Sequence, residues 1–350
     1  MDLTALTGRI DPREAREFVR ELRRQRLMDD PRRALRGTGC AVIVLALGLG
    51  GILLLIALLV PGMPVGSIVS AFAAALVFAL VPAVASTART ARQNARQNAR
   101  SLRLHRFARA NGMTWVPRAK SPPLPGLLFG VGMDREATDV VRWTTPRLVE
   151  VANYRFTSGI GRNRREHRWG YVAIQLDAPL PHIVLDAIGN NGLMGGSNLP
   201  VTVARGQRLS LEGDFDRYFT LWCPAGYERD ALSLFTPDIM ARFIDDAAAL
   251  DVEIVDDRLF LYARGDLSTL DPAMWEWLRA TVVALSAKLD RWGRWRDDRL
   301  VTPGPVVPPP PGVAEPGRRL RPGVPAWAWP VGGVAGLVTA WVAATAFGAR

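Results

Sequence analysis

By residue type and spacing, the acidic residues Glu212, Asp214 and Asp216 come closest to a catalytic or metal-binding group. Carboxylates at alternate positions are the pattern with which a calcium-binding loop begins, and paired carboxylates also serve as general acids and bases. This segment lacks the glycine and the closing glutamate that a calcium loop needs at fixed offsets. A turn between two strands is therefore the main interpretation, and an enzyme with a carboxylate site at these three residues is the alternative.

The other residue types that support catalysis or cofactor binding do not form known patterns. The three histidines, His105, His167 and His182, have no histidine or cysteine neighbour at the spacing of metal ligands. The glycine-rich segment 189–196 lacks the Lys-Ser/Thr pair of a phosphate-binding loop. We therefore predict no catalytic residue, no metal and no cofactor, and an enzyme is the less favoured class.

Two segments carry clustered arginine. The loop 158–168 holds Arg162, Arg164, Arg165 and Arg168, which suit a solvated hairpin tip better than a contact with nucleic acid or lipid headgroups. The second segment, 86–111, reads as a helical stalk. On a helix, five of its arginines fall within about 80° of one another. Like charges on neighbouring turns repel each other, so we expect this stripe to face anionic lipid or acidic protein groups. The stripe consists of Arg89, Arg92, Arg96, Arg100 and Arg103.

Three long uncharged segments dominate the rest of the chain. Residues 40–60 and 66–85 each give about 30 Å of helix, the thickness of a bilayer core. Residues 327–347 form a weaker third segment, in which Gly332 and Gly336 are spaced for close packing of membrane helices. The sequence thus predicts three transmembrane helices. Arginines beside the first two segments place both flanking regions in the cytoplasm.

Residues 112–300 predict a cytoplasmic α+β domain with a mostly antiparallel sheet and packed helices. Strands are expected at 147–157, 169–176, 182–188, 209–211 and 218–223, followed by a hairpin of 252–255 with 259–262. Helices are expected at 227–235, 237–250 and from Asp271 to about Arg296. The proline-rich residues 301–326 form a linker.

Residues 1–39 predict an N-terminal amphipathic helix. Asp11 is the expected cap, and Pro12 takes the first helical position. The apolar face is made by Ala15, Phe18, Val19 and Leu22. This face suits either a membrane surface or packing against protein.

Several segments resemble a family of uncharacterised bacterial membrane proteins, mainly actinobacterial. The resemblance is carried by Asn153–Thr157, by Leu209–Glu228 (LSLEGDFDRYFTLWCPAGYE) and by Asp251–Tyr262 (DVEIVDDRLFLY). It implies membrane spans with a cytoplasmic α+β domain, and it assigns no activity and no catalytic residue.

The charge distribution agrees with a membrane protein rather than a nucleic-acid-binding one. The net charge is +11, yet residues 121–300 are mildly acidic, and the basic excess lies beside the uncharged segments. The sequence therefore predicts a multi-pass protein of the cell membrane that acts as a non-catalytic, membrane-tethered interaction or scaffold module. Its expected partners are the lipid bilayer, anionic lipid headgroups, and a protein partner or a second copy of the chain, without nucleic acid.

Overall fold

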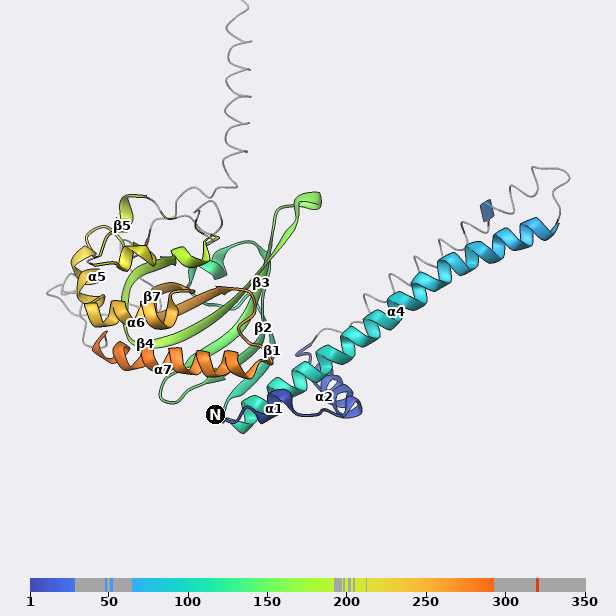
Figure 1. Ribbon diagram of the computed structural model, residues 1–350, viewed down its shortest axis with the longest axis horizontal. Helices are drawn as coiled ribbons and strands as arrows, with labels where there is room; N and C mark the ends of the chain where they lie inside the picture. The colour runs from blue at the N-terminus through green and yellow to red at the C-terminus, as the bar shows by residue number, and fades with distance from the viewer. Residues whose placement is uncertain are drawn as a thin grey trace, which may run out of the picture. The chain divides into compact units, whose positions relative to one another are not determined.

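The computed structural model describes residues 1–28, 48, 51–52, 65–191, 197, 199–200, 203, 205–211, 213–292 and 319–320. These residues form two compact units, which are described separately (Figure 1). The N-terminal unit covers Asp2–Phe107, and the β-sheet unit covers Met1 and Ala108–Arg350.

In the N-terminal unit, two helices pack beside the C-terminal half of a long third helix. These are α1 (Thr4–Thr7), α2 (Pro12–Arg24) and α4 (Val65–Ala110). Asp11 caps α2 by accepting a 2.8 Å hydrogen bond from the Arg13 N–H, so the predicted cap is confirmed. Ala15, Val19 and Leu22 are buried, and Phe18 lies 4.7 Å from the His105 ring of α4. The amphipathic face therefore packs against protein.

The prediction of a membrane-anchored fold is wrong. Within the described part of the chain, no helix combines the length and the apolar character that crossing a membrane requires. Residues 66–85, which were predicted as a membrane span, are the first part of the single helix α4, and this helix continues through seven arginines to Ala110, as predicted for the stalk. The predicted multi-pass location in the cell membrane, with a cytoplasmic domain, depended on these spans and is wrong for the same reason. The predicted spans at 40–60 and 327–347, including Gly332 and Gly336, lie almost entirely outside the described residues.

The β-sheet unit is built on a sheet of seven antiparallel strands. Its strands follow the order β1-β2-β3-β4-β6-β5, and β7 also pairs with β4. Their bounds are β1 Thr114–Lys120, β2 Met133–Trp143, β3 Val149–Ser158, β4 Arg165–Ala187, β5 Arg208–Leu209, β6 Phe219–Trp222 and β7 Asp251–Arg264.

The two longest strands, β4 and β7, bend together. Their pairing is regular from Trp169↔Arg264 to Gln175↔Arg258 and becomes irregular around Leu180↔Asp256. β4 contains Pro179 and Pro181 at this point, and proline cannot donate a ladder hydrogen bond, so the strand bends there. Beyond the bend, β4 pairs with β6 instead of β3.

Three helices lie beside the sheet in Figure 1. Between β6 and β7 come α5 (Glu228–Leu234) and α6 (Pro237–Ala247), and α7 (Pro272–Trp292) follows β7. Leu278, Val282 and Leu285 of α7 are buried, and α7 contacts β4. The core of the sheet centres on Phe129, whose ring lies 5.0 Å from both Tyr154 and Tyr171 in edge-to-face geometry.

A candidate ligand pocket beneath helix α7

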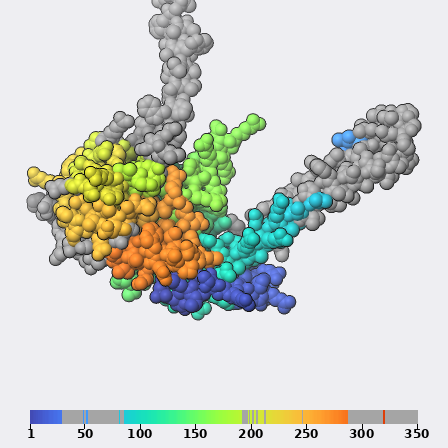
Figure 2. Space-filling view, viewed as in Figure 1, coloured from blue at the N-terminus to red at the C-terminus, as the bar shows by residue number. Residues whose placement is uncertain are grey.

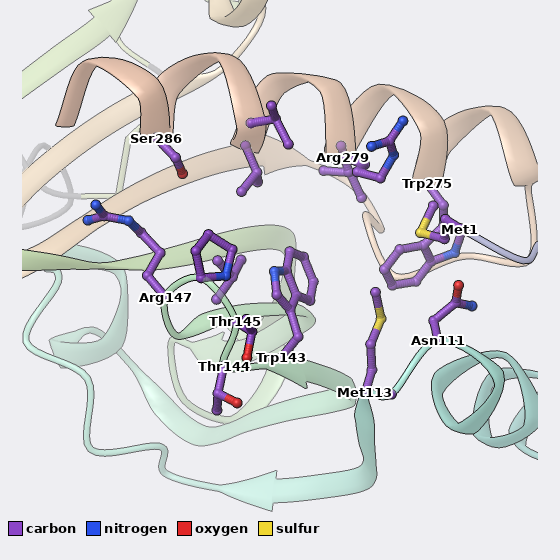
Figure 3. A pocket seen from close by; sticks show the side chains of 16 residues that line it. Met1, Asn111, Met113, Trp143, Thr144, Thr145, Arg147, Trp275, Arg279 and Ser286 are labelled. Atoms are coloured by element: carbon purple, nitrogen blue, oxygen red, sulfur yellow. The ribbon is translucent and has the colours of Figure 1, made fainter. Parts of the chain in front are cut away.

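A pocket of about 540 Å³ lies between α7 and the connection that joins β2 to β3 (Figure 3). Two segments far apart in the sequence form its walls, 143–149 and 275–286, and residues 111–113 and Met1 complete it. The α7 residues at the wall are Trp275, Leu278, Arg279, Val282, Val283 and Ser286. Their spacing of three and four places them on one helical face, which is why a single helix covers the pocket.

The pocket wall is mainly apolar. Trp275 and Leu278 are buried beneath it, and Trp143 and Met113 face Trp275 from the sheet side (Figure 3). Val149 also lines the pocket. The indole N–H of Trp275 donates a 2.8 Å hydrogen bond to the Thr269 carbonyl. Since this bond satisfies the one polar atom of the indole, the ring presents an apolar surface to the pocket.

All ionisable side chains among the lining residues are arginines. Arg147 is held in place by hydrogen bonds to the Gln175 carbonyl at 3.1 Å and to Asp177 Oδ2 at 3.2 Å. Arg279 is exposed, and no described residue forms an ion pair with it. Figure 3 shows Arg147 toward the Ser286 end and Arg279 toward the Trp275 end. An apolar cavity with guanidinium groups and no carboxylate on its wall suits an amphipathic anion.

Elsewhere in the sheet, the buried carboxylate of Glu253 is fully partnered. Its oxygens bond to His182 Nε2 at 2.7 Å and accept from the Tyr262 hydroxyl at 2.7 Å. They also accept from the Leu127 N–H at 3.0 and 2.8 Å. The His182 Nδ1 atom accepts from the Leu320 N–H at 3.2 Å, so a neutral ring donates through Nε2 to Glu253. A buried carboxylate with these partners stabilises the fold.

Asp251 is as deeply buried as Glu253 but less completely partnered. Its Oδ1 atom accepts from the Ala187 N–H at 2.9 Å and from Asn190 at 3.1 Å. No described group bonds to its Oδ2 atom. Burial raises the pKa of Asp251 to about 7, and Asp186 nearby adds to this rise. Burial also raises the pKa of Asp186.

The predicted arginine stripe lies in the N-terminal unit. Arg89, Arg92 and Arg96 are exposed, whereas Arg100 and Arg103 are half-buried. Arg103 donates to the Gly8 carbonyl at 3.2 Å, and the neighbouring Arg106 forms an ion pair with Glu14 of α2. The end of the stripe nearest Ala110 thus meets the N-terminal segment, while a role in recognition for the exposed arginines stays a prediction.

The predicted carboxylate site does not come together as a site. Asp216 accepts hydrogen bonds from the Ser210 hydroxyl and, at 3.2 Å, from the Leu211 N–H, which makes it part of a turn. Asp214 is exposed at the start of a short 3-10 helix, and Glu212 is not among the described residues. In the described part of the chain, no three histidine, cysteine or acidic residues are grouped to hold a metal ion. Cys223 is buried, and burial raises its pKa to about 11, which keeps it a thiol.

The sequence analysis missed the pocket. The apolar stripe of α7 was visible as a helical pattern, but its partner segment 143–149 contains a strand end and a connection without a motif. Trp143 and Trp275 were the available signal, because each of the two main wall segments carries one large aromatic residue.

Neither a protein-family model nor a curated protein matches the sequence. Among solved structures, the chain is similar to the crystal structure of the mycobacterial trehalose monomycolate transport factor A, TtfA. Identity is 13%, the match covers 53% of this chain and 92% of that chain, and the TM-score is 0.37. A similarity of this size carries no argument about function. The resemblance to a bacterial membrane-protein family therefore stays a prediction.

Proposed function

We propose that the β-sheet unit is a non-catalytic binding module whose ligand is an amphipathic anion, an apolar chain that ends in a carboxylate or phosphate. The observation that carries this proposal is the pocket of about 540 Å³ with an apolar wall and two arginines. This volume lies within the range of about 300 to 1,000 Å³ that is typical of small-molecule sites.

The chemistry of the wall favours binding over catalysis. Its lining residues include no carboxylate, histidine, cysteine or lysine, so the pocket itself supplies no general base and no activated nucleophile. The apolar wall gains free energy by removing a hydrocarbon chain from water, at about 25 cal/mol per Å². Arg279, with which no described residue forms an ion pair, supplies a charge-assisted hydrogen bond to the anionic end.

The test is a titration of the full chain with a fluorescent sixteen-carbon fatty carboxylate below its micelle concentration. Val282→Trp fills the pocket and is expected to abolish binding, whereas Ala280→Trp, on the same helix but outside the wall, is expected to leave it unchanged. Equal affinity of the wild type and Val282→Trp would reject the proposal.

The charge requirement has its own test. Arg279→Gln is expected to weaken binding of the carboxylate by about tenfold to a hundredfold, since a hydrogen bond to a charged group contributes roughly 1.5 to 3 kcal/mol. Binding of the matching fatty alcohol should not change. Arg229→Gln, an exposed arginine on α5, is the control.

A further inference from the structure

The hairpin of β3 and β4 carries the most exposed large apolar side chain among the described residues. The strands pair as far as Ser158↔Arg165, and their tip projects beyond the rest of the β-sheet unit in Figures 1 and 2. Ile160 stands at this tip with 86% of its surface exposed. We call residues 158–165 the hairpin tip.

The backbone of the hairpin tip is shaped to present Ile160. Gly159 and Gly161 on either side have φ angles of 77° and 60°, which L-residues with side chains rarely adopt. A Cβ atom at Gly159 would lie 2.3 Å from the Asn163 carbonyl oxygen. The two glycines therefore fix a tight loop that turns a β-branched apolar side chain toward solvent.

The charges around Ile160 are unbalanced. Arg164 pairs with Asp134 at 2.8 Å, and Arg168 pairs with Glu166 at 2.7 Å. Arg162 and Arg165 are exposed, and no described residue forms an ion pair with them. The apex thus combines one apolar side chain with two unneutralised cations.

We propose that the hairpin tip contacts the surface of an anionic lipid bilayer, with Ile160 in the headgroup region and Arg162 and Arg165 against the phosphates. An apolar residue framed by basic ones is the composition that suits this interface. Proteins bind single-stranded nucleic acid through aromatic side chains that stack on bases, and residues 158–165 contain none. Phosphate contacts alone would leave the exposed Ile160 without a role. This inference rests on the hairpin alone and is independent of the pocket.

The contact is expected to be weak and reversible. Stable anchoring takes two signals, and the hairpin tip offers one short apolar side chain and two charges. Its strength should fall with added salt, because attraction between exposed charges is screened over about 8 Å at physiological ionic strength.

The experiment places a local probe on the full chain. Cys40 and Cys223 are replaced by serine, and Asn163→Cys carries an environment-sensitive fluorophore, which leaves Ile160 in place. Vesicles of phosphatidylcholine with 30% phosphatidylglycerol and spin-labelled lipid are added, alongside vesicles of phosphatidylcholine alone. We expect quenching of the probe by the anionic vesicles only, and no quenching of a control probe at Ala280→Cys.

Two variants separate insertion from simple charge attraction. In the labelled protein, Ile160→Ser is expected to lower the vesicle partition coefficient at the probe about tenfold, whereas Leu232→Ser, a second exposed apolar residue, should leave it unchanged. Arg162→Glu combined with Arg165→Glu should abolish quenching. An unquenched probe, quenching in Ile160→Ser at the level of the unsubstituted protein, or a response to single-stranded DNA in place of vesicles would each overturn the proposal.

Discussion

The surroundings of Glu253 and the pocket beneath α7 lie in the same β-sheet unit but differ in how they are packed. Around Glu253, both carboxylate oxygens have donors, and the carboxylate is buried. Beneath α7, apolar side chains surround about 540 Å³ that they do not fill. The hydrogen bonds around Glu253 stabilise the fold. The apolar side chains beneath α7 remain available to contact a ligand.

The largest effect is expected at Glu253. Glu253→Ala removes the acceptor of His182, Tyr262 and the Leu127 N–H and leaves buried donors unpaired. We expect the free energy of unfolding to fall by about 3 to 5 kcal/mol. Urea denaturation measures this, with the exposed Glu276→Ala of α7 as the control. A loss below about 1 kcal/mol would remove the contrast with the pocket.

Asp251 is as buried as Glu253, but one of its carboxylate oxygens has no hydrogen-bond partner among the described residues. Its pKa is about 7 in the folded protein, against an ordinary value of 3.8 for an aspartate, so between these pH values the folded state holds a proton that the unfolded state has lost. Its contribution to stability is therefore fully present below pH 4 and is lost as the pH rises through 7.

Asp251→Asn should remove this dependence. The stability difference between the wild type and the variant is expected to change by about 2 to 4 kcal/mol between pH 4 and pH 8, in favour of the variant at high pH. Chemical denaturation across this pH range measures it. Parallel curves for the two proteins would contradict the account of Asp251.

A smaller loss of stability is expected when the contact between residues 319–320 and the sheet is removed. Arg319 pairs with Asp256 at 2.7 Å, and the Leu320 N–H donates to His182. Asp256→Asn should cost about 1 kcal/mol or less, since Arg319 is largely exposed, and should speed tryptic cleavage near Arg319. Asp257→Asn, beside it in the chain, is the control, and equal cleavage rates in the two variants would argue against this contact.

The irregular pairing at Asp256 was not predicted from the sequence. Asp256-Asp257 was predicted as a hairpin turn, but β7 runs through it as one strand, with Asp256 at a φ of 53° opposite Leu180. The strands predicted at 169–176 and 182–188 are likewise one strand, β4. Local turn signals are overridden here because each strand bends with its partner, and pairing across 70 residues is not visible in a local pattern.

Other elements follow from local chemistry. The cap at Asp11, the end of α4 at Ala110 before Gly112, and the helices α5 to α7 match their predicted positions closely, because capping and periodicity are local properties. Strands β1 and β2 were missed, since Asp134 and Asp139 interrupt β2 at positive φ and obscure its alternation. The pocket was missed because its two walls come from distant segments.

The smallest change in stability is expected for a substitution that fills the pocket. Val282→Trp adds volume where space exists and should alter the free energy of unfolding by less than about 1 kcal/mol. Val172→Trp makes the same change in the closed core of β4 and should cost roughly 1 to 3 kcal/mol or more. Thermal denaturation of both variants compares them. Equal losses would mean that the wall at Val282 is as tightly packed as the core.

We propose that the pocket beneath α7 binds an amphipathic anion, and locating a bound ligand is the decisive measurement. A sixteen-carbon fatty carboxylate with a diazirine on its chain is photolysed with the full protein, and the labelled peptides are identified by mass spectrometry. We predict labels within 143–149 and 275–286, and their loss in Val282→Trp. Labelling that falls elsewhere, or that persists in Val282→Trp at the same level, would contradict the account.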